Sequence, residues 1–117
     1  MSWVYSIAFL QDQYVMVYNP KRHGWEMPGG RIEPGETSMQ AVIREFKEEC
    51  GCGFLPFASK EHREGTVFAG ILQSPCAPAE MKWATFSALP GDISFPDEDY
   101  AALIEWARKR FAEYESK

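Results

Sequence analysis

The chain has 117 residues, which fits one compact domain, residues 1–117, and leaves little room for a second. Hydrophobic residues make up 45% and charged residues 25%, so we do not expect a mainly disordered chain. A net charge of −5 argues against a nucleic-acid polymer as the main partner, because such partners need a cationic face. An acidic protein can still bind a polyphosphate when divalent cations mediate the contact.

The cysteine content predicts free thiols. Cys50, Cys52 and Cys76 are an odd number, and Cys50 and Cys52 lack the C-x-x-C spacing of a zinc knuckle. We expect all three to be reduced structural thiols. The N-terminus has no basic stretch with a cleavage site, and no apolar run approaches ~18 residues. We therefore expect a soluble, cytoplasmic protein that does not insert into a membrane.

The beginning of the chain predicts a β-hairpin. Residues 3–9 and 13–18 are rich in aromatic and β-branched types, which favour strands. The short link 10–12 joins them as a hairpin. Residues 19–24 then form a polar, basic loop.

A turn-rich stretch and a helix follow. Residues 25–30 end in the breaker cluster Pro-Gly-Gly, and residues 34–35 have the Pro-Gly order that a type II turn prefers. Thr37 and Gln40 have the spacing of a capping box, so the helix is predicted to begin after Thr37. Gly51 is a good C-terminal residue and should end it.

The second half of the chain predicts three more strands and a second helix. The strands are residues 54–58, 66–73 and 81–86, with a loop at 74–80. A helix is predicted from 97 to 114. Its apolar residues recur at helical spacing and should be buried: Tyr100, Leu103, Ile104, Ala107 and Phe111. The order of strands, helix, strands and helix predicts an α+β fold with helices packed on a mixed sheet.

The first helix has two distinct faces at about 100° per residue. One arc is apolar and is expected to face the core, with Met39, Val42, Ile43, Phe46 and Cys50. Glu45, Glu48 and Glu49 are spaced i, i+3, i+4 and stack on another face, about 120° from the apolar centre. The helix therefore presents a compact group of carboxylates beside its buried face.

Three neighbouring carboxylates repel one another, by about 1 kcal/mol per pair at 4 Å in water and about 4 kcal/mol at an effective dielectric near 20. One interpretation is a solvated acidic helix face, which is common. The other is a binding site for Mg²⁺, which prefers oxygen ligands and binds through a few carboxylates plus substrate phosphates. The helix alone leaves both interpretations open.

The segment 30–52 reads GRIEPGETSMQAVIREFKEECGC. It resembles the signature of the Nudix hydrolase superfamily, G-x5-E-x7-R-E-U-x-E-E-x-G-U, where U is a bulky apolar residue. The residues that match at the required spacing are Gly30, Glu36, Arg44, Glu45, Phe46, Glu48, Glu49 and Gly51. Cys52 is smaller than the aliphatic residue usual at the last position, which affects local packing more than chemistry. The resemblance favours the metal site and implies an α/β/α sandwich with a mixed central sheet.

The resemblance also implies roles for individual residues. By matching positions, Mg²⁺ (or Mn²⁺) would be bound by the carbonyl of Gly29 and the carboxylates of Glu45, Glu48 and Glu49. Glu36 and Arg44 would orient these ligands, a role whose loss is usually costly. The metals would polarise a diphosphate and lower the pKa of a bound water, which attacks phosphorus.

The general base remains open among several glutamates. Glu45 is our first candidate to accept the proton of the attacking water, in addition to binding metal. Members of the superfamily differ in this residue, so Glu80, Glu61 and Glu64, outside the signature, are alternatives. Each of these three also fits an ordinary exposed charge on a loop or strand.

Several residues outside the signature are candidates for substrate binding. Arg22 and His23 lie on the basic loop and would meet phosphate or base, unless that loop is simply solvated. Trp25 suits either stacking on a nucleobase or core packing. Asp97 and Asp99 stand where nucleotide-sanitising relatives recognise an oxidised purine, although acidic residues there also complement a helix dipole.

The function implied by the resemblance is hydrolysis of a nucleoside diphosphate linked to another group. The favoured substrate is a nucleoside triphosphate, ordinary or oxidised such as 8-oxo-dGTP, cleaved to monophosphate and pyrophosphate. ADP-ribose or a dinucleoside polyphosphate is an alternative substrate, and a catalytically silent Nudix module that senses a nucleotide is an alternative function. The expected partner is a small nucleotide, and exposed strands are compatible with a homodimer.

Overall fold

The computed structural model describes residues 2–63, 65–95 and 97–117, together with all side chains in these ranges except those of 97 and 98. Its elements, in chain order, are β1 (Trp3–Leu10), β2 (Gln13–Asn19), β3 (Gly24–Glu26), β4 (Gly29–Arg31), α1 (Ser38–Cys50), β5 (Gly53–His62), β6 (Gly65–Gln73), β7 (Lys82–Phe86) and α2 (Asp97–Glu115). No helix among the described residues is long and apolar enough to cross a membrane.

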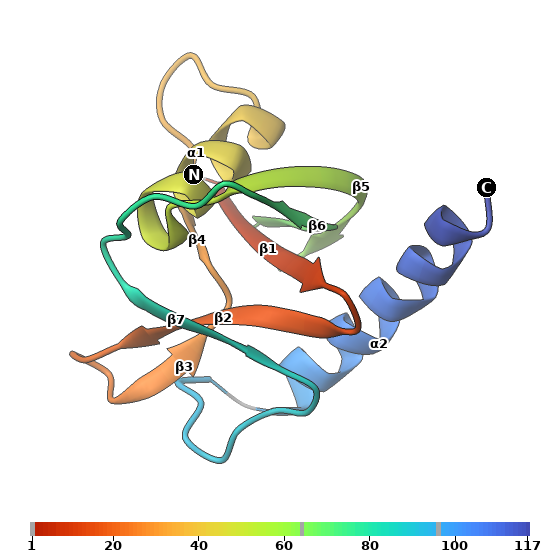
Figure 1. Ribbon diagram of the computed structural model, residues 1–117. Coiled ribbons are helices and arrows are strands. Elements are labelled where there is room, and N and C mark those ends of the chain that lie inside the picture. Colours follow the sequence, from red (N-terminus) through yellow and green to blue (C-terminus); the bar gives the residue numbers. More distant parts are fainter. Residues whose placement is uncertain (1, 64, 96) are drawn as a thin grey trace.

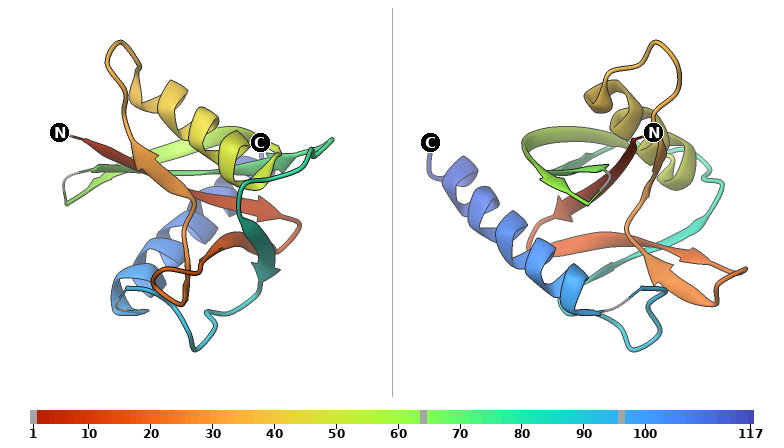
Figure 2. Two further views of the ribbon diagram at one scale, coloured as in Figure 1. Left: turned by 90° about the vertical axis from the view of Figure 1, so that its left-hand side faces the viewer. Right: turned by 180° about the vertical axis from the view of Figure 1, so that it is seen from behind.

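The strands form one mixed sheet between two helices. The strand order is β3-β2-β1-β6-β5, with β4 also paired to β1 and β7 to β2. β1 and β6 run parallel and the other pairs are antiparallel. Val42 and Phe46 of α1 belong to one buried cluster, whereas Leu103 and Ile104 of α2 belong to another. The helices therefore cover opposite faces of the sheet (Figures 1 and 2), which confirms the predicted α+β sandwich.

The predicted hairpin is present, but its two strands pair over a short stretch. Phe9 faces Tyr14 and Leu10 faces Gln13, whereas the first half of β1 pairs with β4. β3 and β4 were not predicted as strands: Gly24 was placed in the polar loop, and residues 25–30 were interpreted as ending in a breaker cluster, because Gly and Pro are depleted in strands. Both segments are instead held by backbone pairing to neighbouring strands. β5 extends beyond the predicted 54–58 to His62, since polar side chains are tolerated on a strand at the sheet edge.

The turn and caps around α1 follow the sequence signals. The Glu36 amide donates to the Glu33 carbonyl at 3.0 Å across the Pro-Gly turn, and Gly35 has φ 86°, which glycine adopts without strain. Thr37 is the N-cap, and both hydrogen bonds of the capping box with Gln40 are present. Gly51 ends α1 in the left-handed conformation, as predicted.

The buried face of α1 differs from the predicted one. Met39 is 50% exposed and Ile43 is 37% exposed, so two of the five expected core residues are wrong. The buried apolar residues are instead Ala41, Val42, Phe46 and Cys50. At 100° per residue the buried arc is turned by about 50° toward the glutamates. The reason is that α1 packs against β4 as well as β1 and β5, which draws its acidic side toward the sheet.

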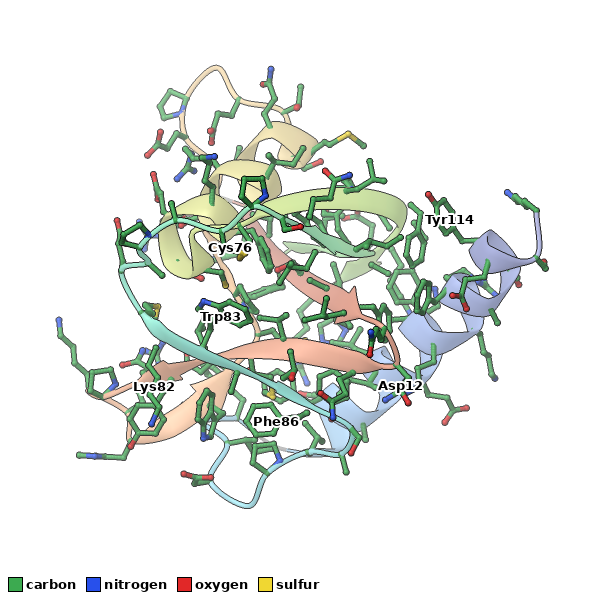
Figure 3. All side chains as sticks on the ribbon, in the orientation of Figure 1. Asp12, Cys76, Lys82, Trp83, Phe86 and Tyr114 are labelled. Atoms are coloured by element: carbon green, nitrogen blue, oxygen red, sulfur yellow. A yellow bond between two sulfur atoms is a disulfide. The ribbon has the colours of Figure 1, made fainter. Side chains whose placement is uncertain are left out.

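The expectation of three free thiols was also wrong. Cys52 and Cys76 form a disulfide, and only Cys50 is a free, buried cysteine. The Ala77 amide donates to the Gly51 carbonyl at 2.8 Å, which brings the 74–80 loop against the end of α1. Figure 3 shows Cys76 at this place. The two cysteines are 24 residues apart, so their spacing gave no indication of the pairing.

Helix α2 matches its prediction closely. Tyr100, Leu103, Ile104 and Ala107 are buried, and Phe111 is half-buried. The ring of Phe111 stacks on Phe9 and on Phe57 at centroid distances of 4.6 and 5.6 Å. Arg108 also donates to the Asp12 carbonyl at 2.9 Å, which ties α2 to the β1–β2 turn. Asp12 lies beside α2 in Figure 3.

Candidate active site

The glutamates of α1 lie against the glycines of β4. The Glu45 carboxylate occupies the space that a Cβ on Gly30 would fill. The Gly29 amide donates to Glu49 Oε1 at 3.0 Å. A Cβ on Gly29 would collide with the Val4 carbonyl, so this edge of the sheet requires glycine. The acidic face of α1 therefore packs two carboxylates directly against the backbone of β4.

Arg44 holds the other side of the cluster. Its Nε and Nη2 donate to the Glu36 carboxylate at 2.6 and 2.9 Å, a bidentate pair. Nη2 also donates to the Arg31 carbonyl at 3.0 Å. Nη1 donates to Glu48 Oε1 at 3.3 Å and lies 3.6 Å from Glu45 Oε2. One guanidinium thus fixes the loop before α1, the β4 backbone and two carboxylates of the cluster.

The protonation of these carboxylates reflects their surroundings. Burial is the main cause that raises the pKa of Glu49 to about 8 and that raises the pKa of Glu45, and each is raised further by a neighbouring glutamate. The hydrogen bond from Arg44 is the main cause that lowers the pKa of Glu36 to about 2. The cluster therefore gathers negative charge that the fold itself does not fully neutralise.

A hard divalent cation fits this donor set, which consists of carboxylate and carbonyl oxygens with no sulfur or imidazole. Within residues 2–63, 65–95 and 97–117, no three acidic, histidine or cysteine side chains already converge as a metal site. The carboxylates of Glu45 and Glu48 turn toward Arg44, and Glu49 turns toward the Gly29 amide. Small side-chain rotations about a rigid helix would be needed to bring these oxygens onto one ion.

A pocket of about 620 Å³ lies on the α2 side of the sheet. Its apolar wall consists of Trp3, Tyr5, Met27, Phe95, Tyr100 and Leu103, and its polar wall of His62, Arg63 and Asp99, with Gly65 completing the lining. Arg63 Nη2 donates to Asp99 Oδ2 at 2.7 Å and so joins the β5–β6 turn to α2. The pocket combines a large aromatic surface with a few polar groups, as small-molecule sites do.

The pocket and the glutamates are neighbours across β4. Tyr5 lines the pocket, and its Cδ1 is 2.8 Å from the position of a Cβ on Gly29. Gly29 also donates to Glu49 on the α1 side. Gly29 therefore lies between Tyr5 of the pocket wall and the Glu49 carboxylate.

The predicted substrate-binding residues are found in different places. Arg22 is bound to Glu26, and His23 is exposed on the β2–β3 turn with φ 55°. Trp25 packs edge-on against Tyr18 and Phe86 and does not line the pocket. Phe86 lies on β7 in Figure 3. Asp99 does line the pocket, whereas the side chain of Asp97 lies outside the described part of the chain.

The alternative bases are also separated. The Glu80 amide donates to the Glu48 carbonyl at 3.1 Å, so its residue adjoins the cluster, and its charge contributes to the raised pKa of Glu49. Glu61 is exposed on β5 and accepts a hydrogen bond from Thr66 at 3.1 Å. Glu64 lies outside the described residues.

Sequence reasoning missed most of the pocket. Tyr5, Met27 and Leu103 were expected in strands, loops or core, with no role in a site. Arg63 was not selected at all. The only available signal was chemical: Phe95 is an aromatic residue in a loop beside the acidic residues that precede α2.

Comparison with known proteins agrees with the fold and the signature. Residues 5–109 match the family model described as NUDIX domain. A putative 8-oxo-dGTP diphosphatase of Bacillus subtilis (strain 168) is 52% identical over 82 residues, which are 70% of this chain and 48% of that protein. The 8-oxo-dGDP phosphatase NUDT18 of Mus musculus is 43% identical over 58 residues, 45% of this chain and 18% of that protein. The chain thus spans about half or less of these relatives.

A solved structure shows the same fold. A NUDIX hydrolase from Nitrosomonas europaea superposes with a TM-score of 0.72 at 21% identity, covering 96% of this chain and 88% of that one. A UDP-X diphosphatase superposes with a TM-score of 0.73 at 16% identity, covering 97% and 64%. At these identities the likeness establishes the arrangement of sheet and helices alone.

Proposed function

The chain belongs to the NUDIX domain family, and from this premise we propose that it is a divalent-cation-dependent hydrolase of a nucleoside diphosphate derivative. One observation carries the proposal: the carboxylates of α1 contact the glycines of β4, and Tyr5 of the 620 Å³ aromatic pocket lies beside Gly29 of the same strand. A compound with a planar base and a diphosphate chain matches both features: the base suits the aromatic pocket, and the diphosphate suits a cation held by the carboxylates. The family's signature glutamates are all present.

Glu45, Glu48, Glu49 and the Gly29 carbonyl would hold Mg²⁺ or Mn²⁺. When bound, the cation supplies charge for the diphosphate oxygens and acidifies a water molecule. Arg44 and Glu36 orient the carboxylates through the bidentate pair and the contact with Glu48. The absence of a Cβ on Gly29 and Gly30 lets the Val4 carbonyl and the Glu45 carboxylate pack closely against β4, which holds Glu45 at the site.

Glu45 is the proposed acceptor of the proton that the attacking water releases. Its carboxylate is only 16% exposed, and burial raises its pKa toward the range in which a general base works. Glu80 is the best placed alternative because its backbone is bonded to α1. A Glu80→Gln variant with unchanged kcat would leave Glu45 as the candidate.

The proposed substrate is a nucleoside triphosphate, ordinary or oxidised such as 8-oxo-dGTP, cleaved to monophosphate and pyrophosphate. The names of two relatives, an 8-oxo-dGTP diphosphatase and an 8-oxo-dGDP phosphatase, support an oxidised guanine nucleotide. Asp99 in the pocket wall is a suitable acceptor for the N–H groups of a purine.

The test is a panel of nucleotides that includes 8-oxo-dGTP, dGTP, ADP-ribose and a dinucleoside polyphosphate, each incubated with Mg²⁺. Release of nucleoside monophosphate is measured for the protein and for Glu48→Gln, which should lose most activity without losing the fold. Turnover of ADP-ribose alone would replace the proposed substrate. If no diphosphate compound is cleaved, the enzyme assignment is wrong and a nucleotide-sensing role takes its place.

A further inference from the structure

Phe95 has an unusual position for a large apolar residue. Its side chain is 44% exposed, yet it lines the 620 Å³ pocket and meets Tyr100 edge-on at a centroid distance of 6.2 Å. An exposed aromatic ring at a pocket wall binds a ligand more tightly when its orientation is fixed before the ligand arrives. The surroundings of Phe95 show what fixes it.

The backbone before Phe95 is docked on β3. The Trp25 amide donates to the Asp92 carbonyl at 2.8 Å, and the Ser94 amide donates to the Trp25 carbonyl at 3.1 Å. Gly24 allows this close approach, since a Cβ there would lie 2.6 Å from Ser94 Oγ. The backbone position of Phe95 is thus determined by β3, although its ring orientation is not.

Arg22 lies on the ring. Its guanidinium carbon is 5.3 Å from the Phe95 centroid, within the range of a cation–π contact. Nε and Nη2 donate to the Glu26 carboxylate at 2.6 and 3.0 Å. The Asn19 side chain accepts from the Arg22 amide at 3.4 Å, which shapes the turn that carries it. Arg22 is therefore held at two points.

Glu26 provides a firm anchor for this guanidinium. Its side chain is only 10% exposed. Burial raises the pKa of Glu26, but hydrogen bonds, that of Arg22 foremost, outweigh it, so the pKa is below the ordinary value. The carboxylate stays charged at neutral pH and needs Arg22 as its counter-ion.

We propose that Arg22 is a positioning residue: anchored by Glu26, its guanidinium backs the Phe95 ring and fixes it as the wall on which the base of the substrate stacks. This inference rests on the proposed function for the identity of the ligand. Arg22 acts through Phe95 and does not contact the phosphates. It accordingly affects substrate affinity and leaves the chemical step unchanged.

The kinetic experiment compares Arg22→Met with the wild type on two substrates, the best nucleotide of the panel and ribose 5-triphosphate, which lacks a base. A cation–π contact of about 0.5–1 kcal/mol corresponds to an increase of KM of about two- to fivefold for the nucleotide. The kcat and the KM for ribose 5-triphosphate should stay unchanged. Arg110→Met is the matched control, because it removes another Arg–Glu pair, with Glu113, that does not line the pocket.

Two further variants separate positioning from folding. Arg22→Lys keeps a cation for the ring and should recover part of the affinity. In a Phe95→Leu background, Arg22→Met should add no further increase of KM. Equal increases of KM for both substrates, or additive effects of the two changes, would overturn the proposal, since Arg22 would then act on the phosphates or on the fold.

A measurement without turnover keeps this proposal distinct from the proposed function. The NMR signal of the Phe95 ring can be observed in ¹³C-phenylalanine-labelled protein and assigned by its loss in Phe95→Leu. Its chemical shift should change in Arg22→Met and stay the same in Arg110→Met. An unchanged signal in both variants would refute the contact. Failure of the wild type to cleave any nucleotide would instead refute the proposed function, whatever the ring signal shows.

Discussion

The two sides of the sheet are built in opposite ways. On the α1 side, the candidate catalytic residues come from one short stretch of chain: Glu36, Arg44, Glu45, Glu48 and Glu49. Among the described residues, their side-chain hydrogen bonds stay within this stretch, the turn that precedes it and β4. On the α2 side, the pocket is assembled from β1, the residue Met27, the β5–β6 turn and the start of α2. We infer that the chemistry is encoded locally and the recognition of the base non-locally. Changes on the α1 side should then lower kcat for every substrate, and changes on the α2 side should alter KM.

The largest effect is expected on the α1 side. Glu45→Gln keeps the size of the side chain but removes both the negative charge and the proton acceptor. We expect kcat to fall at least about a hundredfold, within the range typical of lost acid–base catalysis. Initial rates of monophosphate release should show this for all cleaved substrates alike. A loss confined to one nucleotide would break the comparison, because a local chemical site should not discriminate between bases.

The difference in construction also explains what the sequence could predict. The capping box at Thr37, the C-cap at Gly51 and the spacing of the glutamates are local signals, and α1 was predicted nearly to the residue. The rotation that exposes Met39 and Ile43 was not predictable, because it follows from packing against β4.

The pocket shows the same limit more strongly. Its residues Tyr5 and Arg63 are far apart in sequence and have no common pattern, so only the tertiary structure brings them together. The disulfide between Cys52 and Cys76 belongs to the same class of non-local feature. In the α2 region, helical periodicity predicted the buried face, but nothing in that periodicity indicated a cavity beside Leu103.

The disulfide gives the next largest effect, on stability. It closes a loop over a sequence separation of 24, for which the chain-entropy model predicts about 3.5 kcal/mol. The loop it secures donates from Glu80 and Met81 to the carbonyls of Glu48 and Glu49. Cys76→Ser should therefore lower the free energy of unfolding by about this amount, as measured by denaturant titration.

A reducing agent supplies the control for this prediction. It should destabilise the wild type to the level of Cys76→Ser and have no effect on the variant itself, whose remaining Cys50 and Cys52 stay thiols. If the reducing agent destabilises both proteins equally, the loss of stability does not come from the disulfide. The expected result would sharpen the comparison, because it would show that a covalent bond to a distant part of the chain stabilises the fold around the locally encoded site.

Glu49 should produce an intermediate effect on stability in metal-free protein. Its folded-state pKa, about 8, is raised above the unfolded value of 4.5. The contribution of Glu49 to the free energy of unfolding is therefore complete below pH 4.5 and is lost as pH rises through 8. Glu49→Gln removes this pH dependence. The full shift corresponds to roughly 5 kcal/mol, which we reduce to about 2 kcal/mol because the residue is partly exposed.

Free energies of unfolding, measured at pH 5 and pH 8 in the presence of a chelator, test the direction of this pH dependence. The wild type should lose stability over this interval while Glu49→Gln changes much less. Glu48→Gln, whose side chain is 45% exposed, serves as the matched control and should resemble the wild type. Adding Mg²⁺ at pH 8 should restabilise the wild type more than Glu49→Gln, because only the wild type retains the full carboxylate set.

The smallest effect is expected on the α2 side, where Asp99 is both a pocket residue and the partner of Arg63. Asp99→Asn should raise KM for a purine nucleotide about two- to tenfold, the value of one hydrogen bond of about 0.5–1.5 kcal/mol, with kcat unchanged. Arg63→Gln breaks the same ion pair but keeps the carboxylate. Since the arginine is 68% exposed, losing the pair should cost less than about 1 kcal/mol of stability. If Arg63→Gln raises KM as much as Asp99→Asn, the ion pair itself shapes the pocket. If only Asp99→Asn raises KM, the carboxylate contacts the base directly. The α2 side would then discriminate between bases by a specific hydrogen bond, whereas the α1 side would act on the diphosphate of every substrate.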